Sequence, residues 1–383
     1  MNGRTTLTMG NSGQVARMLA DLEHLVVCES YSSDLEAVAR SAVVVAEVGS
    51  RLLGTAPKTL VVDGVTHLRW TFGTPRVLLV GHHDTVWPIG SLATHPWSVA
   101  DGIARGPGVF DMKAGLVQLF HAVASLPSPD GVRVLITGDE ELGSATSSTL
   151  IEESARGCAA AFVLEASADG GALKTARKGA SRYEIVVSGK AAHAGLEPEK
   201  GANAAVEAAH QILAVNALGP LMNQGLPEAH GPRATTVTPT LLSAGTTENT
   251  VPDRATLRVD VRVPTTTAQR RVDELIRALP TRTPGTRLDI LGGPDRPPLE
   301  ATSSATLFTL AQQAAARLGM EPLRGVAVGG VSDGNLTAGV GCPTLDGLGA
   351  VGGGAHADDE HIVVAHLPQR TALLAELIKA VRT

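Results

Sequence analysis

Three apolar runs in this 383-residue sequence end in side chains that can bind a metal ion or transfer a proton. A histidine beside a carboxylate is a common arrangement of a metal ligand and the group that orients it. Adjacent carboxylates repel one another unless cations compensate. Each motif alone is also compatible with an ordinary polar loop. The runs, with the residues that follow them, are Val77–Val80 with His82 and Asp84, Val132–Ile136 with Asp139, Glu140 and Glu141, and Ala160–Leu164 with Glu165.

Two further candidates follow glycine-rich turns. Asp111 comes shortly after Gly106-Pro107-Gly108, and His356 comes after Gly352–Gly354. Alone, Asp111 could equally be a helix N-cap, and a lone loop histidine is often simply exposed. Together with the histidine and glutamates after the apolar runs, they form a set of imidazole and carboxylate ligands that suits Zn²⁺, Co²⁺ or Mn²⁺. The set is large enough for two metals with one bridging carboxylate, which implies hydrolysis by a metal-activated water.

The apolar runs also predict how these residues are positioned. Continuous runs are typical of parallel strands buried on both faces, and Lys113–Leu126 repeats apolar residues at helical spacing. This alternation predicts an α/β fold with an open mixed sheet flanked by helices, whose chemistry gathers at the carboxyl ends of the strands.

The pattern changes near residue 178, where apolar and polar residues begin to alternate as in half-buried strands. We therefore expect an independent α+β domain over residues 178–293, inserted into a discontinuous α/β domain of residues 1–177 and 294–383. The expected strands of this region are Ser181–Ser188, Arg254–Val263 and Arg287–Leu291, and the expected helices there and beyond are Gly201–Leu218, Thr267–Leu279, Ser304–Leu318 and Pro368–Val381.

Composition narrows the classes of function. With 32 basic and 38 acidic side chains, the net charge of −6 offers no electrostatic footprint for nucleic acid or an anionic membrane. Cys28, Cys158 and Cys342 are far apart, so neither a disulfide framework nor a cysteine zinc site is expected. The apolar runs are much shorter than the roughly 20 residues that span a bilayer, and no signal peptide is apparent. We expect a cytoplasmic protein.

In order and context, these motifs resemble the co-catalytic dizinc metallopeptidases. That family includes glutamate carboxypeptidase (carboxypeptidase G type), succinyl-diaminopimelate desuccinylase and acetylornithine deacetylase. The resemblance extends from about Ala16 to His361. It implies two Zn²⁺ per subunit, with Co²⁺ or Mn²⁺ possible, and an inserted domain that mediates homodimerisation.

The resemblance also implies a role for each metal ligand. One zinc ion would be held by His82 and Glu165, and the other by Glu141 and His356. Asp111 would bridge the two ions.

Further roles follow from the same resemblance. Asp84 would orient the first histidine ligand, and Glu140 would be the general base that takes a proton from the bridging water. His193, in the inserted domain, would stabilise the oxyanion in the partner's active site. Asn249 and Arg262 match positions that hold the substrate carboxylate in the glutamate carboxypeptidase branch. From its sequence context alone, His193 could also be an ordinary surface-loop residue, and Arg262 the exposed face of a strand.

The sequence departs from the family pattern at several positions. Met112 stands where the family often has a second Asp, and His83 where it usually has an apolar residue. The basic cluster Lys174, Arg177 and Lys178 lies near the substrate-side lysine of the branch, in a slightly shorter loop.

The function implied by the resemblance is metal-dependent hydrolysis of an amide bond that releases a C-terminal amino acid. The alternative is an N-acyl-amino-acid deacylase or desuccinylase with the same metal site, because no motif reports on the acyl side. A metal-bound protein without catalysis is a third class, and retention of Glu140 argues against it.

Overall fold

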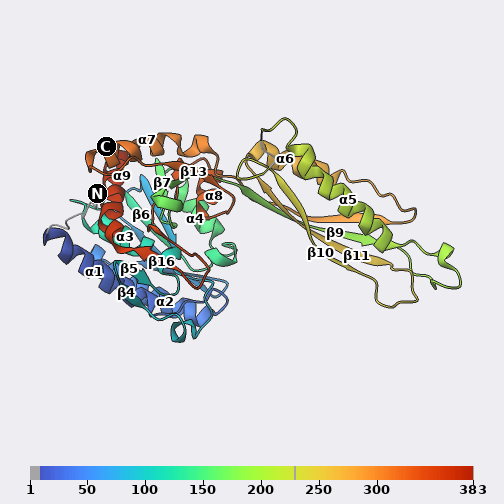
Figure 1. Ribbon diagram of the computed structural model, residues 1–383, viewed down its shortest axis with the longest axis horizontal. Coiled ribbons are helices and arrows are strands. Elements are labelled where there is room, and N and C mark those ends of the chain that lie inside the picture. Colours follow the sequence, from blue (N-terminus) through green and yellow to red (C-terminus); the bar gives the residue numbers. More distant parts are fainter. Residues whose placement is uncertain (1–8, 228–229, 383) are drawn as a thin grey trace. The chain divides into compact units, whose positions relative to one another are not determined.

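The computed structural model describes residues 9–227 and 230–382, which divide into two compact units (Figure 1). Unit 1 contains the described residues up to 175, residues 301–326 and the described residues from 332 onward. Unit 2 contains residues 176–300 and 327–331. A separate two-stranded sheet is made of β8 (Leu173–Arg177) and β13 (Gly325–Val328).

The main sheet of unit 1 is open and mixed, as the sequence predicts. In sheet order its strands are β1 (Lys58–Val62), β2 (Val65–Thr71), β6 (Val132–Thr137), β3 (Val77–His82), β7 (Ala160–Val163) and β14 (Thr344–Leu345). The strands from β6 to β14 are parallel, whereas β1 and β2 are antiparallel to their neighbours. Because β3, β6 and β7 are parallel, their carboxyl ends meet at one edge of the sheet.

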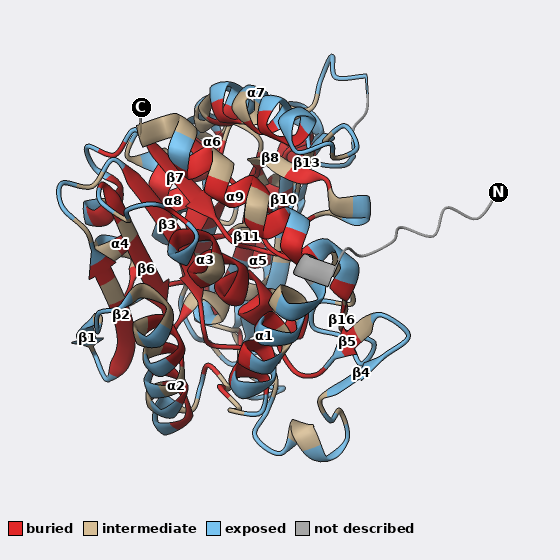
Figure 2. Ribbon diagram, turned by 90° about the vertical axis from the view of Figure 1, so that its left-hand side faces the viewer, coloured by how far each residue is buried: buried red, intermediate tan, exposed pale blue. Residues whose placement is uncertain are grey.

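Helices cover both faces of this sheet. One group consists of α1 (Met9–Val26), α2 (Leu35–Leu53), α3 (Ala114–Ala124), α7 (Ala301–Arg317) and α9 (Leu367–Arg382), and the other of α4 (Ser148–Ala155) and α8 (Asp333–Gly339). Alternate residues of β3 pack against the two groups of helices. Val77 and Leu79 pack with the first group, and Leu78 and Val80 pack with the second. Figure 2 shows the strands buried between the layers, while α1 and α2 expose one side.

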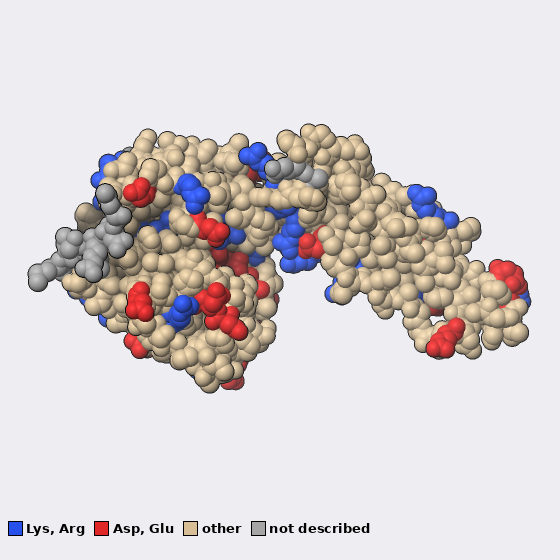
Figure 3. All heavy atoms as spheres, in the orientation of Figure 1, with Lys and Arg blue, Asp and Glu red and all other residues tan. Residues whose placement is uncertain are grey.

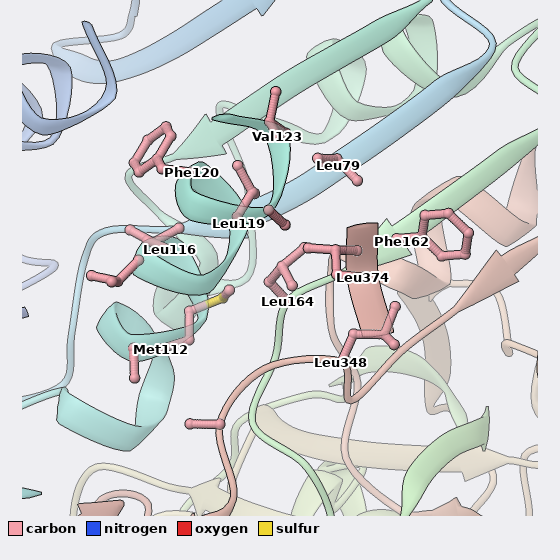
Figure 4. Close-up of a cluster of buried hydrophobic side chains, with 14 of the residues drawn as sticks. Leu79, Met112, Leu116, Leu119, Phe120, Val123, Phe162, Leu164, Leu348 and Leu374 are labelled. Atoms are coloured by element: carbon pink, nitrogen blue, oxygen red, sulfur yellow. The ribbon is translucent and has the colours of Figure 1, made fainter. Parts of the chain in front are cut away.

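Helix α3 lies in the centre of the larger layer and is buried on nearly all sides. Its side chains, among them Leu116, Leu119 and Phe120, meet Leu79 of the sheet in one apolar cluster (Figure 4). Phe120 also packs edge-on against Trp70, with ring centroids 5.4 Å apart. Burial of each such side chain contributes about 1.5–3 kcal/mol to the stability of the fold. The start of α3, which lies next to the candidate site, is therefore held firmly by the core.

A second, small sheet in unit 1 joins two loops that matter for the site. It consists of β15 (Gly352–Gly353), β16 (His361–Val363), β5 (Ile103–Arg105) and β4 (Ser98–Ala100), in that order. His356 lies in the loop between β15 and β16, and Asp111 lies shortly after β5. Pairing of His361 with Arg105 holds these loops in fixed register.

Unit 2 is built on an antiparallel sheet with the order β10 (Thr236–Ala244), β11 (Arg254–Val263), β9 (Gly179–Ser188), β12 (Arg287–Arg296). Helices α5 (Ala204–Met222) and α6 (Thr266–Arg277) pack on it, with Val215 and Val272 in a core that includes alternate residues of β11. Asn203 caps α5 by accepting hydrogen bonds from the Ala205 and Val206 amides. Strand β10 is an edge strand whose last residues are exposed.

Acidic and basic side chains both occur on the face seen in Figure 3. Among the described residues, no helix combines the length and apolarity needed to cross a membrane.

Candidate metal centre

The predicted metal ligands lie together in unit 1, at the ends of strands or in the turns and loops that follow them. His82 is the last residue of β3, Glu141 lies in the helical turn Glu140–Leu142 after β6, and Glu165 follows β7. Asp111 lies in the irregular turn Val109–Lys113 before α3, and its peptide bond to Met112 is cis. His356 has a left-handed backbone with φ of 62°.

The carboxylate of Asp111 lies between the two imidazoles. Its Oδ1 is 3.4 Å from Nε2 of His82, and its Oδ2 is 3.4 Å from Nε2 of His356. Nε2 of His82 is also 3.4 Å from Oε1 of Glu165, and Nε2 of His356 is 3.2 Å from Oε2 of Glu141. Each ring nitrogen therefore faces the carboxylate of Asp111 and that of one glutamate.

Several donor atoms of this cluster are buried without a hydrogen bond. Within the described part of the chain, Nε2 of His82, Oδ1 of Asp111 and Oε1 of Glu141 have no hydrogen-bond partner. Donor atoms of His82, Asp111 and Glu141 lie within 4.8 Å of one another, as do those of His82, Glu140 and Glu165. Buried polar atoms without partners are costly, and nitrogen and carboxylate donors suit Zn²⁺ and similar metals. The cluster therefore fits metal ions.

The electrostatics of the cluster reflect an excess of carboxylates. Burial opposes charge on the ring of His82, but attraction to the nearby carboxylates of Asp111, Asp84 and Glu165 outweighs burial and raises its pKa well above the usual value. Asp111 and Glu141 raise the pKa of His356 to about 10. Burial, reinforced by the charge of Glu165, raises the pKa of Glu140 well above its usual range. The site thus favours binding of positive charge.

Asp84 is fully buried beside the first histidine. Nδ1 of His82 is 3.0 Å from the backbone carbonyl oxygen of Asp84 and 3.5 Å from its carboxylate. That carboxylate instead accepts hydrogen bonds from the Ser32 hydroxyl at 2.8 Å and from the amides of Glu140 and Glu141 at 3.2 Å each. Asp84 thus orients the His82 ring mainly through its main chain, while its side chain holds the turn that carries both glutamates.

Asp139, the first of three consecutive acidic residues, points away from the cluster. Its carboxylate accepts hydrogen bonds from the amide and hydroxyl of Thr146 and from the hydroxyl of Ser147. The hydroxyl of Ser144 donates in turn to Asp333. Sequence reasoning missed this scaffold because its acceptors and donors are brought together by a loop whose path no local pattern specifies.

Glycines allow the start of helix α3 and the loop after β14 to come close to Leu164, the residue before Glu165. A Cβ on Gly115 would lie 2.1 Å from the carbonyl oxygen of Leu164, and one on Gly349 would lie 2.2 Å from the same atom. Both distances are shorter than van der Waals contact allows. Only glycine therefore fits at these two positions without displacing Leu164 and the glutamate after it.

Met112 and His83, the two residues near the ligands that depart from the family pattern, both make buried hydrogen-bond contacts. The sulfur of Met112 accepts a hydrogen bond from the backbone N–H of His82 at 3.3 Å. His83 is buried away from the cluster, with its ring nitrogens 3.2 Å from the Ser41 hydroxyl and 3.0 Å from the Thr66 carbonyl. Burial lowers its pKa to about 4.

The remaining predicted site residues belong to unit 2. His193 and Asn249 are exposed on neighbouring loops, joined by a hydrogen bond from the Ala194 amide to the Asn249 carbonyl. Arg262 lies on β11, and its Nε and Nη2 each donate to the carboxylate of Asp260 at 3.0 Å.

Two side chains of the basic cluster around residue 178 are buried, and one of them donates hydrogen bonds to nearby backbone carbonyls. Arg177 donates to the carbonyls of Gly330 and Val331. Lys178 is buried, and burial together with the charge of Arg262 lowers its pKa.

Comparison with known proteins decides the family. The sequence pattern of peptidase family M20/M25/M40 matches residues 78–380. The chain belongs to this family. Its sequence is 30% identical to carboxypeptidase G2 of Pseudomonas sp. (strain RS-16), over 94% of this chain and 88% of that protein. It is 28% identical to succinyl-diaminopimelate desuccinylase of Gluconacetobacter diazotrophicus, over 80% of this chain and 81% of that protein.

Solved structures of M20 peptidases share the fold. Aminopeptidase PepT of Bacillus cereus has a TM-score of 0.75 at 23% identity and covers 96% of this chain and 99% of its own. The M20 metallo-carboxypeptidase Sso-CP2 of Sulfolobus solfataricus has a TM-score of 0.73 at 17% identity and covers 95% and 99%. The predicted fold and family are therefore confirmed, and this M20 protein is a hydrolytic enzyme that acts on amide bonds.

Proposed function

We propose that this M20 enzyme uses two divalent metal ions, most simply Zn²⁺, to hydrolyse an amide bond and release a C-terminal amino acid. The observation that carries the proposal is the position of Asp111, whose two carboxylate oxygens each face a different imidazole. In the proposed assignment, His82 and Glu165 hold one metal, Glu141 and His356 hold the other, and Asp111 bridges them. Bound metals supply Lewis-acid polarisation of the carbonyl and lower the pKa of water.

Glu140 is the proposed general base. It is adjacent to a ligand in sequence but takes part in none of the four contacts that His82 and His356 make with the carboxylates of Asp111, Glu165 and Glu141, so we assign its carboxylate to proton transfer. Hydrogen bonding of its amide to Asp84 fixes the backbone from which its side chain extends. The raised pKa of Glu140 suits a group that must first accept a proton from water and then deliver it to the leaving amine.

Recognition of the substrate is proposed for residues of unit 2. Arg262 has the planar fork that suits a carboxylate, and Asp260 holds two of its nitrogen atoms in place. Asn249 would contribute an amide to the same carboxylate. His193, exposed on the loop beside Asn249, would donate to the oxyanion that forms during attack.

We further propose that unit 2, the inserted domain predicted over residues 178–293, forms a homodimer. Edge strand β10 exposes Leu241 and Leu242, which are 61% and 54% accessible. Helix α5 exposes Leu213, which is 70% accessible. An edge strand with exposed apolar side chains is a surface that proteins usually cover, which supports pairing with a second copy. In that dimer His193 would serve the partner's site.

A second candidate is N-acyl-amino-acid deacylation, which the desuccinylase relative supports. Both reactions use the same metal chemistry and the same free carboxylate, and they differ only in the acyl group. The test is a substrate panel that contains N-acyl and peptidyl glutamates, acetylornithine and succinyl-diaminopimelate. Release of glutamate at the highest kcat/KM supports the carboxypeptidase assignment, whereas preference for either of the last two would replace it with deacylation.

A further inference from the structure

Glu360 is a buried carboxylate, only 3% exposed, that neither the metal assignment nor the substrate assignment uses. It accepts four hydrogen bonds. Its Oε1 accepts from the amides of Phe110 and Asp111 at 2.9 Å each, and its Oε2 accepts from the amide of Gly108 at 3.0 Å and from the indole N–H of Trp87 at 2.6 Å.

These four bonds join three segments that carry candidate ligands. Trp87 lies on the loop that follows His82, and the three amides belong to the turn that presents Asp111. Glu360 itself lies four residues after His356, at the end of the same loop. A single carboxylate therefore fixes the spacing between its own loop and two segments that precede it by 249 to 273 residues in sequence.

Only an ionised carboxylate satisfies this environment. All four partners are N–H donors, and a carboxylate offers acceptors alone, so no contact is mismatched. A glutamine of the same shape would direct its NH₂ group against two of the donors and would lose the negative charge. Because both oxygens are engaged, Glu360 is not free to bind a metal or accept a proton from substrate.

We propose that Glu360 is a positioning residue that sets the Asp111 carboxylate at the correct distance from both histidines, and that it does so through the backbone of the turn. The inference rests on the proposed metal site. Removing groups that orient metal ligands typically lowers metal affinity by about 10–100-fold, and Glu360 acts on the ligand that both metals would share.

The test compares Zn²⁺ affinity of the full-length wild type and of Glu360→Gln, measured by competition with a chromophoric chelator. We expect at least about a tenfold loss of affinity, together with a changed visible absorption spectrum of the Co²⁺-loaded protein. Glu29→Gln is the matched control. Its carboxylate accepts from the amides of Gly90 and Leu92, on the same loop as Trp87, but has no hydrogen bond to the Asp111 turn.

The outcomes separate the inference from the proposed function. If the wild type binds no Zn²⁺, the metal assignment itself is wrong. If the wild type binds Zn²⁺ and a folded Glu360→Gln binds it equally well, or if Glu29→Gln loses as much, the positioning role is wrong. A lower Tm without metal at unchanged affinity would mean that Glu360 is merely structural. Should Glu360→Gln fail to fold, Glu360→Asp decides in the same way, since it keeps the charge but shortens the reach.

Discussion

Asp111 shows how much of the chemistry depends on single side chains. It is held through its own amide by Glu360, and its carboxylate lies between His82 and His356. Within the described residues, Nε2 of His82, Oδ1 of Asp111 and Oε1 of Glu141 are buried without a hydrogen bond. Metal binding should therefore stabilise the folded protein as well as activate it.

Removal of metal is the first prediction at this scale. Dialysis against a strong chelator should abolish hydrolysis and lower Tm, and added Zn²⁺ or Co²⁺ should restore both. Elemental analysis of the active protein should give about two metal ions per chain. Full activity with one ion or none would contradict the shared role of Asp111.

The adjacent glutamates provide the second prediction. Glu140→Gln cannot accept a proton, so kcat should fall at least about 10²-fold while metal content stays unchanged. Glu141→Gln should lose metal, because one of its oxygens lies 3.2 Å from Nε2 of His356. Metal analysis beside steady-state kinetics distinguishes the two, and the reverse pattern would mean that their roles are exchanged.

The third prediction concerns Arg262. Replacement by alanine should lower kcat/KM mainly for substrates with a free carboxylate, because a bidentate contact is lost. Asp260→Asn should have a similar but smaller effect, since the amide holds the guanidinium less firmly than the present pair at 3.0 Å. Equal losses on an amidated substrate would show that Arg262 is only structural.

At the scale of elements, a buried charge helps to hold the glycine-rich loops of unit 1 in place. Arg370 on α9 is 3% exposed and donates to the carbonyls of Gly349 and Gly171 at 3.0 Å each, and to that of Gly347. Burial lowers its pKa to about 10, which leaves it charged at neutral pH. One side chain thus holds the loop that leads to His356.

Replacing Arg370 tests this arrangement. Arg370→Met would leave buried carbonyls without donors, each at a cost of about 1–3 kcal/mol, so the free energy of unfolding should fall by at least about 2 kcal/mol. Arg317→Met on α7 is the control. Arg317 is exposed, and its ion pair with Glu376 is long, at 4.0 Å, so its loss should change the stability little. Urea denaturation of both variants makes the comparison, and equal stability would contradict the anchoring role.

The sequence predicts the strands that present the candidate ligands because both faces of each strand are covered. The run Val77–Val80 must be apolar at every position, which leaves a clear signal, and the polar residue after it marks the edge of the sheet. Likewise, the alternation in Arg254–Val263 coincides with β11. The start of α5 at Ala204 instead of residue 201 follows from the cap at Asn203.

The residues that position the site could not be predicted in this way. Glu360 stands in the stretch Asp358-Asp359-Glu360, which looks like a solvated acidic loop. Its role depends on donors from distant segments, and only the folded chain brings these together. Asp84 was identified by its spacing from His82, yet its carboxylate is engaged by Ser32 and two amides, which the spacing does not indicate.

At the scale of the whole molecule, the proposed division of labour places the metal ligands in unit 1 and His193, Asn249 and Arg262 in unit 2. If His193 serves the partner of a dimer, a single active site needs two chains. This can be tested by mixing two inactive variants, one with its defect in unit 1 and one with its defect in unit 2. In a mixed dimer, one of the two active sites would then contain neither defect.

Mixed dimers give a prediction at the scale of the whole molecule. His193→Ala and Glu140→Gln homodimers should each be nearly inactive, but a mixed dimer contains one site with both defects and one with neither. Co-refolding should restore up to about one quarter of wild-type activity if half the dimers are mixed. Each variant refolded alone is the control. Failure to regain activity, with mixed dimers verified by mass, would mean that His193 does not act on the partner.

The order of pairing in unit 1 also constrains how the chain acquires its fold. Thr344 of β14 pairs with Ala161 of β7 in the main sheet. During synthesis, β7 therefore has no partner on this side until the ribosome has added β14, more than 180 residues later. All strand pairs of the unit 2 sheet lie within residues 179–296 and can form meanwhile. Once folded, unit 2 replaces a long flexible loop between β7 and β14 by an ordered segment. This lowers the entropy cost of bringing these two strands together. We therefore expect unit 2 to fold during synthesis ahead of unit 1, whose nascent β7 edge stays unpaired and vulnerable to association until the last segment arrives.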